Sequence, residues 1–392
     1  MMTGLSSKKI PFWIEFIIFY CLLASANVSV TFGQSFWIEF AVAFICFIYF
    51  YSINALRCTD ATILASFFLI LCWVYSNHGG SFVGYVAKFM QVSLAVVLLN
   101  LKNVWRIELL ETISKWFASL LAVSIIAWII HFIIPLPHTT SIIWSPWGGT
   151  EYHHNYYLFI IVDKLDHFQR FQSFFLEPGH LGTIVSFFLI VNRFDFKKRQ
   201  NLIFLLCIIL SMSASAFVLS ALGYLLFKYL ENGNMKFLMY AFVATFLMIF
   251  FTYYNGGDNI INNIIFSKLN RDSGAIEGRV SIEILSMYNE MLSSGQDLIF
   301  GKTAFLDVEA QGAGIILYFV QNGIIGVVLL IVAYLSIYLS CRSKYGFVVF
   351  IVYLVSFLQR TYPQWDAFSL PFILGLAVFA YKEKKLKTVI RY

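Results

Sequence analysis

One long uncharged stretch decides the topology of the chain. From Asn201 to Phe227 the sequence is N-L-I-F-L-L-C-I-I-L-S-M-S-A-S-A-F-V-L-S-A-L-G-Y-L-L-F. A single α-helix over 200–230 would be ~45 Å long, too long for one crossing of ~30 Å of hydrocarbon. The serine-rich segment Ser211–Ser215 can interrupt it, because serine side chains hydrogen-bond their own backbone. We therefore predict two short helices in a tight hairpin, 200–212 and 214–230.

The composition around this stretch is that of a membrane protein. Of the 392 residues, 60% are hydrophobic and 12% are charged, whereas a soluble domain has about 25% charged residues. Apolar runs near ~20 residues long predict an all-α polytopic membrane protein, with residues 1–392 forming a single integral membrane domain. The net charge of +6 is explained by basic cytoplasmic loops, and it does not indicate a nucleic-acid partner.

The apolar runs predict about twelve membrane spans. The predicted spans are 10–30, 35–56, 61–76, 82–101, 113–134, 177–193, 200–212, 214–230, 236–254, 312–340, 345–360 and 366–381.

Lysine and arginine residues test this arrangement. If the amino terminus is cytoplasmic, 19 of the 27 Lys and Arg residues fall on the cytoplasmic side and 7 on the opposite side, while Lys88 lies within a span. The short loops follow the positive-inside rule one after another, which predicts that both termini are cytoplasmic. A single span over 200–230 would reverse every later loop and place the basic tail outside. The charges therefore favour the hairpin.

Two connections, 135–176 and 255–311, are far longer than the others, and both are expected on the outer face. Connections of this length are usually functional or form small subdomains. The second contains an amphipathic stretch, Val280–Leu292, whose apolar side chains form one stripe. Such a stretch could lie at the membrane surface.

The segment F-Q-S-F-F-L-E-P-G-H-L-G, Phe171–Gly182, leads into a predicted span from the outer face. Pro178 suits the first turn of a helix, which places Glu177 at the N-cap and His180 on the same face. A helix amino terminus attracts anions, and Arg170 just upstream could clamp a phosphate through two hydrogen bonds. We interpret the segment as a site for an anionic headgroup beside a candidate general base. The alternative is a helix cap with a surface glutamate.

The second long loop contains N-R-D-S-G-A-I-E-G-R, with Arg271 and Arg279 on a face that is otherwise poor in basic residues. Arginines in two outer loops provide what a diphosphate ligand needs. The alternative is that they are solvated loop charges.

Other polar residues are less specific. E-Y-H-H-N, 151–155, and D-K-L-D-H, 163–167, contain metal-ligating residue types, but their spacing matches no regular zinc pattern. The six cysteines include no C-x-x-C pair, so we predict neither a metal site nor a cofactor. W-S-P-W, 144–147, suits an interfacial anchor and might also stack on a sugar ring.

A lysine and a pair of small residues within the predicted spans also need an interpretation. Lys88 is either functional or snorkels toward the interface. Apart from Lys88 and edge residues such as Glu15 and Glu39, the spans are nearly free of charge. The small residues Ala216 and Ser220, four apart, are expected to serve close helix packing.

Taken in order, four segments resemble the O-antigen and capsular polysaccharide polymerases, a family within the superfamily that also includes the O-antigen ligases. They are the arginine followed by F-F-L-E-P-G-H-L-G, the serine-rich break S-M-S-A-S, the outer-loop pair G-R-V-S-I-E-I-L and L-I-F-G-K, and the return segment G-A-G-I-I-L-Y-F-V-Q-N-G-I-I-G. The resemblance covers about Arg170 to Gly326 by pattern and the whole chain by topology.

The resemblance implies a class C glycosyltransferase-like fold in the bacterial inner membrane and a metal-independent, inverting glycosyl transfer. The donor and the acceptor would be undecaprenyl-diphosphate-linked glycans, with a chain-length regulator and a flippase as possible partners besides membrane lipids. Family arginines that engage the diphosphate correspond to Arg170 and Arg279, and less surely to Arg271. Glu177 and His180 are the candidate catalytic bases, because a sugar hydroxyl must lose its proton as it attacks.

Two alternatives remain from the sequence. An O-antigen ligase would transfer the finished glycan to lipid A core, but the histidine that ligases often place before the return helix is replaced here by Glu309, Ala310 and Gln311. This chain also does not reproduce the spacing between an arginine and a glycine that is expected in some polymerases. A lipid-linked glycan flippase or another transporter would place charged residues along a cavity through many spans.

Overall fold

The helices of the bundle form from the apolar runs of the sequence. The computed structural model describes residues 9–26, 35–144, 150–163, 169–233, 282–302, 314–359 and 365–389. The bundle helices are α1 (Phe12–Ser25), α2 (Phe36–Ser52), α3 (Asp60–Tyr75), α4 (Phe82–Leu99), α5 (Asn103–His131), α6 (Pro178–Val191), α7 (Arg199–Ser211), α8 (Ala214–Asn232), α12 (Ile315–Ser340), α13 (Lys344–Gln359) and α14 (Asp366–Val389).

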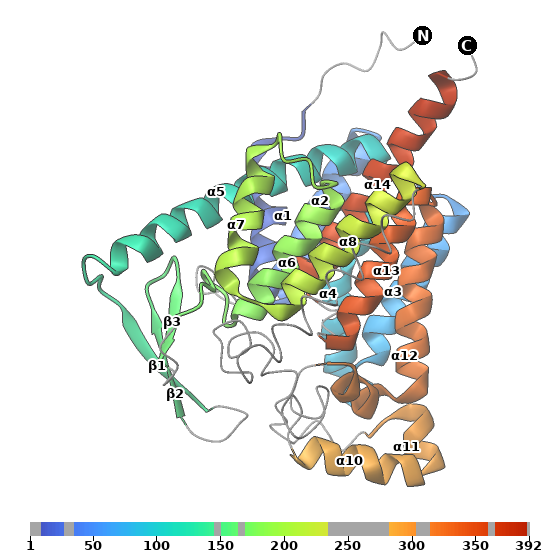
Figure 1. Ribbon diagram of the computed structural model, residues 1–392. Helices are drawn as coiled ribbons and strands as arrows, with labels where there is room; N and C mark the ends of the chain where they lie inside the picture. The colour runs from blue at the N-terminus through green and yellow to red at the C-terminus, as the bar shows by residue number, and fades with distance from the viewer. Residues whose placement is uncertain are drawn as a thin grey trace.

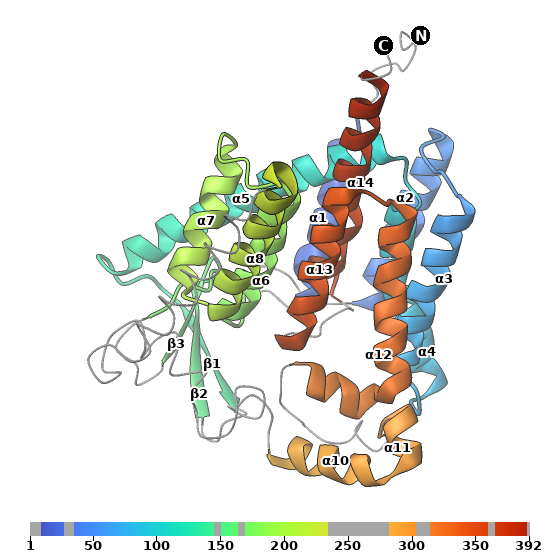
Figure 2. The same ribbon diagram turned by 45° about the vertical axis from the view of Figure 1, so that its right-hand side comes forward.

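Helices α1 to α8 alternate in direction along the bundle, as do α12 to α14, so the bundle has two distinct ends (Figures 1 and 2). We call the end where α1 begins and α14 finishes the tail end, and the opposite end the loop end. Helices α2, α4, α6, α8 and α14 all begin at the loop end. Basic residues gather in the connections at the tail end, including Arg57, Lys102, Arg193, Lys197, Lys198, Arg342 and Lys344.

Four helices among the described residues are long and apolar enough to cross a membrane, namely α4, α5, α12 and most of α8, Ala214–Glu231. The other bundle helices coincide with predicted spans but are shorter. The predicted span 236–254 lies outside the described residues. The chain is therefore mostly helical with candidate membrane-spanning helices, and twelve spans remain a prediction.

Helix α5 begins ten residues before the predicted span at 113, because its polar first turns find partners. Arg106 is buried, and its guanidinium donates to Cys341 Sγ at 3.1 Å and to the carbonyl of Ile373. Glu108 accepts from the backbone N–H of Ile10 at 3.2 Å. Hydropathy alone placed the start of the predicted span too late, because it does not detect such pairing.

The predicted hairpin is confirmed. Helix α7 ends at Ser211 and α8 begins at Ala214, with Met212 in the left-handed region at φ 45°. The Ser211 hydroxyl donates to the carbonyl of Ile208 at 2.9 Å, and the hydroxyls of Ser213 and Ser215 are 2.9 Å apart. These local hydrogen bonds compete with the helical ladder, as expected for serines at a break.

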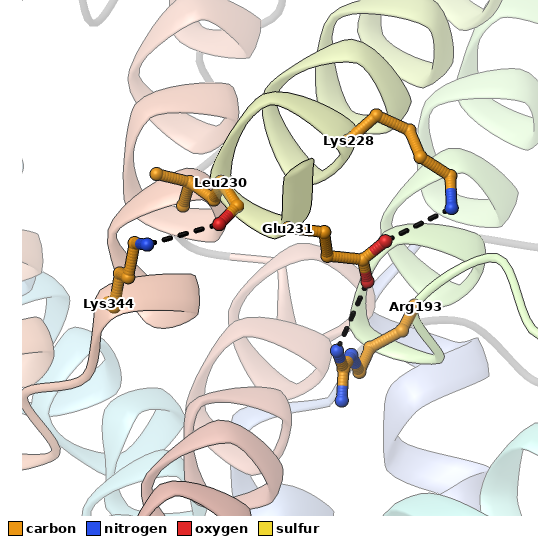
Figure 3. Close-up of polar contacts among 5 residues, drawn as sticks. All are labelled: Arg193, Lys228, Leu230, Glu231 and Lys344. Atoms are coloured by element: carbon orange, nitrogen blue, oxygen red, sulfur yellow. Dashed lines mark hydrogen bonds and ion pairs between the residues drawn. The ribbon is translucent and has the colours of Figure 1, made fainter. Parts of the chain in front are cut away.

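At the tail end, a cluster of polar contacts joins α8, α13 and the connection after α6 (Figure 3). Glu231, in the last turn of α8, pairs with Arg193 at 3.3 Å and with Lys228 at 3.0 Å. Lys344, at the start of α13, donates to the carbonyl of Leu230 at 3.0 Å. A lysine at a helix carboxyl end is favourably placed, because it satisfies a free carbonyl and complements the helix dipole.

The first long loop contains a three-stranded antiparallel sheet that the sequence analysis did not predict. Its order is β1 (Thr139–Trp144), β2 (Thr150–Asn155) and β3 (Ile160–Asp163). Hydrogen bonds attach the sheet to the bundle: Ile160 N–H donates to Ser173 O at 2.7 Å, and the hydroxyls of Ser124 and Ser173 are 2.7 Å apart. The mostly helical chain is consistent with the predicted all-α membrane protein, and its bundle carries a small sheet at the loop end.

The described part of the second long loop is helical. It forms α10 (Ile282–Ser293) and α11 (Gly295–Phe300), which lie beside the first turns of α12 (Figure 2). The amphipathic helix predicted over 280–292 is confirmed within the described residues, with Ile284 and Met291 buried. Helix α12 is broken at Gly323, where φ is 62°.

Candidate functional site at the loop end

The first turn of α6 places the two candidate bases side by side. Glu177 is the N-cap residue in an extended conformation and Pro178 is the first helical residue, as predicted. Glu177 Oε2 lies 4.0 Å from His180 Nε2. The glutamate side chain is 55% exposed and the histidine side chain 7% exposed. The pair therefore has one accessible carboxylate backed by a buried imidazole.

The Glu177 carboxylate does not act as a helix cap. Its side chain makes no capping hydrogen bond to the first turn of α6, although an N-cap side chain usually accepts from the N2 or N3 backbone N–H. Of the alternative interpretation, a helix cap with a surface glutamate, the structure shows the N-cap position and the exposed side chain but no capping hydrogen bond from that side chain. The amino-terminal N–H groups of α6 keep their partial positive charge at the same place.

Trp365 completes the surroundings of His180, and the sequence analysis did not identify it. The His180 and Trp365 rings meet at a centroid distance of 5.0 Å and an interplanar angle of 76°. Trp365 directly precedes α14 and also packs against Phe368 at 5.7 Å. The starts of α6 and α14 thus meet at the histidine. No signal in the sequence links residues so far apart in the chain.

A second group of charges lies buried at the same end. Glu39 is 2% exposed near the start of α2, and Asp366, the first residue of α14, is 1% exposed. Lys88, in α4, is attracted electrostatically by Glu39, whereas Glu39 and Asp366 repel each other. Both carboxylates lie at the edges of predicted spans, as the sequence analysis expected of Glu39, and the structure adds that both are buried.

The predicted arginines are only partly described. Arg170 is half-buried, and the following residue, Phe171, donates its N–H to Leu210 O at 3.1 Å, next to the end of α7. Arg271 and Arg279 lie outside the described residues. Arg170 therefore lies at the loop end, and a site that combines Arg170 with Arg271 and Arg279 stays a prediction.

Lys302 is a further loop-end cation. Its Nζ lies 2.6 Å from Glu290 Oε2 of α10. The hydrogen bond and charge of Lys302 lower the pKa of Glu290 below its ordinary value. Lys302 is thus engaged with α10 rather than with the pair at the start of α6.

Close packing holds α6 in place behind the pair. A Cβ on Gly182 would lie 2.7 Å from the Cβ of Ala216 in α8, closer than side chains tolerate. The Ser186 hydroxyl donates to Gly182 O at 2.7 Å, and Ser220 donates to Ser186 at 2.9 Å. The predicted packing role of Ala216 and Ser220 is confirmed. It fixes the first turn of α6 against the helical hairpin.

The metal-ligating residue types of the first loop form no cluster within its described part. Among the described residues, no three His, Cys, Asp or Glu side chains lie close enough to hold a metal ion. His153 is buried in the sheet, and His154 is hydrogen-bonded to Thr140 at 3.0 Å.

Comparison of the chain with protein-family models, curated proteins and solved structures found no match. A functional assignment must therefore come from the residues of this chain and their arrangement.

Proposed function

We propose that the chain is a polysaccharide polymerase that transfers a growing glycan from undecaprenyl diphosphate to the nonreducing end of a lipid-linked repeat unit. The observation that supports this most is the exposed Glu177 carboxylate, which does not cap α6 and lies 4.0 Å from His180. A carboxylate held at the amino-terminal end of a membrane helix is suited to accept a proton from a sugar hydroxyl.

In the proposed step, Glu177 accepts the proton of the acceptor hydroxyl as its oxygen attacks the anomeric carbon of the donor sugar. The bond between that carbon and the diphosphate oxygen breaks, and the diphosphate leaves with the bonding electron pair. The anomeric centre acquires oxocarbenium character, as in glycoside hydrolysis. A single displacement inverts its configuration.

The leaving diphosphate requires positive charge at the loop end. We assign this role to Arg170, with Arg279 and Arg271 from the second long loop. Guanidinium groups match phosphate oxygens with paired hydrogen bonds and stabilise the developing charge without giving up a proton. The partial positive charge at the start of α6 adds to theirs.

In this proposal His180 supports Glu177 and does not itself accept the proton. Its buried ring is held by Trp365, so it offers a fixed polar group behind the carboxylate. When protonated, an imidazole at this distance would stabilise the ionised form of Glu177, which is the form able to accept a proton.

The proposal includes a location. We propose twelve spans and a class C glycosyltransferase-like architecture, with both termini cytoplasmic, in the inner membrane. In this orientation the loop end lies on the periplasmic side, where lipid-linked repeat units would be bound. The concentration of basic residues at the tail end agrees with this orientation.

One observation favours a second candidate function. The buried carboxylates Glu39 and Asp366 and the half-buried Lys88 lie within the helical bundle, where ionisable residues usually mark a transport pathway. A lipid-linked glycan transporter would use such residues, whereas the polymerase would use Glu177.

The test is a gel ladder of surface glycan from cells that lack the chain. Wild-type chain should restore the ladder, while Glu177→Ala and Arg279→Ala should leave single repeat units on the core. Complete loss of core-linked glycan in the deletion would favour a ligase or a transporter. An unchanged ladder in the deletion would exclude the polymerase.

A further inference from the structure

A contiguous set of rings covers one side of the β1–β2 hairpin. The centroids of His138 and His154 are 4.7 Å apart, and those of His138 and Tyr156 are 5.0 Å apart. Tyr156 stacks on Phe159 at 4.5 Å, with their planes 10° apart. The ring of His131, at the end of α5, lies 4.5 Å from that of Tyr156.

The strand register explains why these rings share one side. Thr140 pairs with His154 across the two strands, and their side chains are hydrogen-bonded at 3.0 Å. Alternation along β2 places Tyr152 on the same side as His154 and turns His153 to the other side, where it is buried. We call the side formed by His138, Thr140, Tyr152, His154 and Tyr156 the ring face.

The ring face is amphipathic and carries no cation. His138 and Thr140 are exposed, and Tyr152 is 45% exposed. The segment 135–163 contains no lysine or arginine and two carboxylates, Glu151 and Asp163, and Asp163 pairs with Tyr152 across β2 and β3. Such a surface lacks the cations that an anionic lipid surface or a nucleic acid would require. Flat rings beside hydroxyl and imidazole groups match a sugar, which presents an apolar C–H face and a hydroxyl rim.

The sheet is also connected to the candidate site. Ile160 N–H donates to Ser173 O, and Ser173 is hydrogen-bonded to Ser124 of α5. Glu177 lies four positions after Ser173, at most ~14 Å of extended chain. A glycan lying on the ring face would therefore begin close to the first turn of α6.

We propose that the ring face binds the glycan chain of the lipid-linked substrate by stacking of its sugar rings. This inference rests on the proposed function, because it assigns the glycan part of that substrate to the sheet. The diphosphate would lie at the start of α6, and the sugars would extend over β1 and β2.

The test places p-benzoyl-phenylalanine at position 152 of the full chain in living cells. After irradiation, the purified protein is stained for periodate-oxidisable carbohydrate. Position 51 is the control, because Tyr51 is a tyrosine even more accessible than Tyr152, 71% against 45% exposed, at the tail-end terminus of α2. Carbohydrate attached at position 152 and not at position 51 is the expected result. Equal labelling at both positions, or labelling at neither, would overturn the inference.

Binding measurements on the purified full chain in nanodiscs give a second readout. The probe is lipid-linked glycan extracted from the same cells. Tyr152→Ala should bind it about tenfold more weakly, since one aromatic contact is lost, whereas Tyr152→Phe and Tyr51→Ala should bind like wild type. Unchanged binding by Tyr152→Ala would contradict the ring face.

The two proposals can fail separately. If cells without the chain lose the glycan ladder but no carbohydrate is attached at position 152, the polymerase stands and the ring face is wrong. If carbohydrate is attached while the deletion leaves the ladder intact, the sheet binds glycan and the polymerase assignment is wrong.

Discussion

The imidazole of His180 lies edge-on to the indole of Trp365, with ring centroids 5.0 Å apart. This contact joins the first turn of α6 to the residue that precedes α14. His180 also lies 4.0 Å from the carboxylate of Glu177. The position of the candidate base therefore depends on a tryptophan from the other end of the sequence.

Substitution of Trp365 should impair the site without unfolding the bundle. Trp365→Ala removes the ring against His180, and an edge-to-face pair contributes about 0.5–1.5 kcal/mol beyond its buried area. We expect up to about a tenfold loss of polymerisation rate. Trp365→Phe keeps a ring at this position and should retain most of the activity. Shorter chains on the glycan ladder for Trp365→Ala would show the effect, and equal ladders for both variants would argue against a positioning role.

Substitution of Glu177 should have a much larger effect. Glu177→Gln keeps the shape of the side chain and removes its ability to accept a proton, so the rate should fall by about 10²–10⁴-fold. The matched control is Glu231→Gln, which changes a carboxylate of the tail-end cluster in Figure 3. That control should keep the wild-type rate, and both variants should insert at wild-type levels. Equal rates for Glu177→Gln and wild type would remove Glu177 from the mechanism.

The arrangement of the bundle was largely predictable from the sequence, because a membrane span and a serine-rich break each leave a local pattern. The hairpin at Met212 and the helix starts at Pro178 and Asp366 lie within a residue of the predicted positions. The sheet was missed because its strands are short and share their loop with polar turns. Trp365 and the buried Asp366 were missed because contacts between distant helices leave no periodicity in the sequence.

The glycine at the break of α12 should be sensitive to substitution. Gly323 has φ 62°, and a Cβ there would lie 2.4 Å from the carbonyl oxygen of Ile299. Gly323→Ala should therefore lower the stability by about 1–3 kcal/mol or more, because both strain and a backbone clash arise. Gly295→Ala is the control, since a Cβ there meets nothing within 4 Å. Thermal unfolding of the detergent-solubilised chain should show a lower Tm only for Gly323→Ala, and equal Tm values would contradict the close approach at Gly323.

The contact between Glu290 and Lys302 should make α10 sensitive to acid. Lys302 lowers the pKa of Glu290 from its ordinary value of 4.5. A carboxyl group with a lowered pKa stabilises the folded state above its ordinary pKa, and this contribution is lost as pH falls through the lowered value. The effect should be small and salt-dependent, because the Glu290 side chain is 65% exposed.

This prediction is tested by amide hydrogen exchange of the residues in α10. The exchange rates are converted to protection factors, which correct for the pH dependence of the intrinsic exchange rate. Protection should be constant from neutral pH down to 4.5, the ordinary pKa of Glu290, and should decrease below it. Lys302→Met should abolish this dependence while keeping the side-chain stem. A decrease of the same size in Lys302→Met would show that another group is responsible.

The most direct test of the central claim is polymerisation by the purified chain. The chain is reconstituted in nanodiscs with undecaprenyl-diphosphate-linked repeat units extracted from the same cells, and the products are separated by size. We predict that wild-type chain produces lipid-linked ladders with release of undecaprenyl diphosphate, whereas Glu177→Gln produces almost none. Absence of any product longer than one repeat unit with wild-type chain, or an equal ladder with Glu177→Gln, would contradict a polymerase whose base lies at the start of α6.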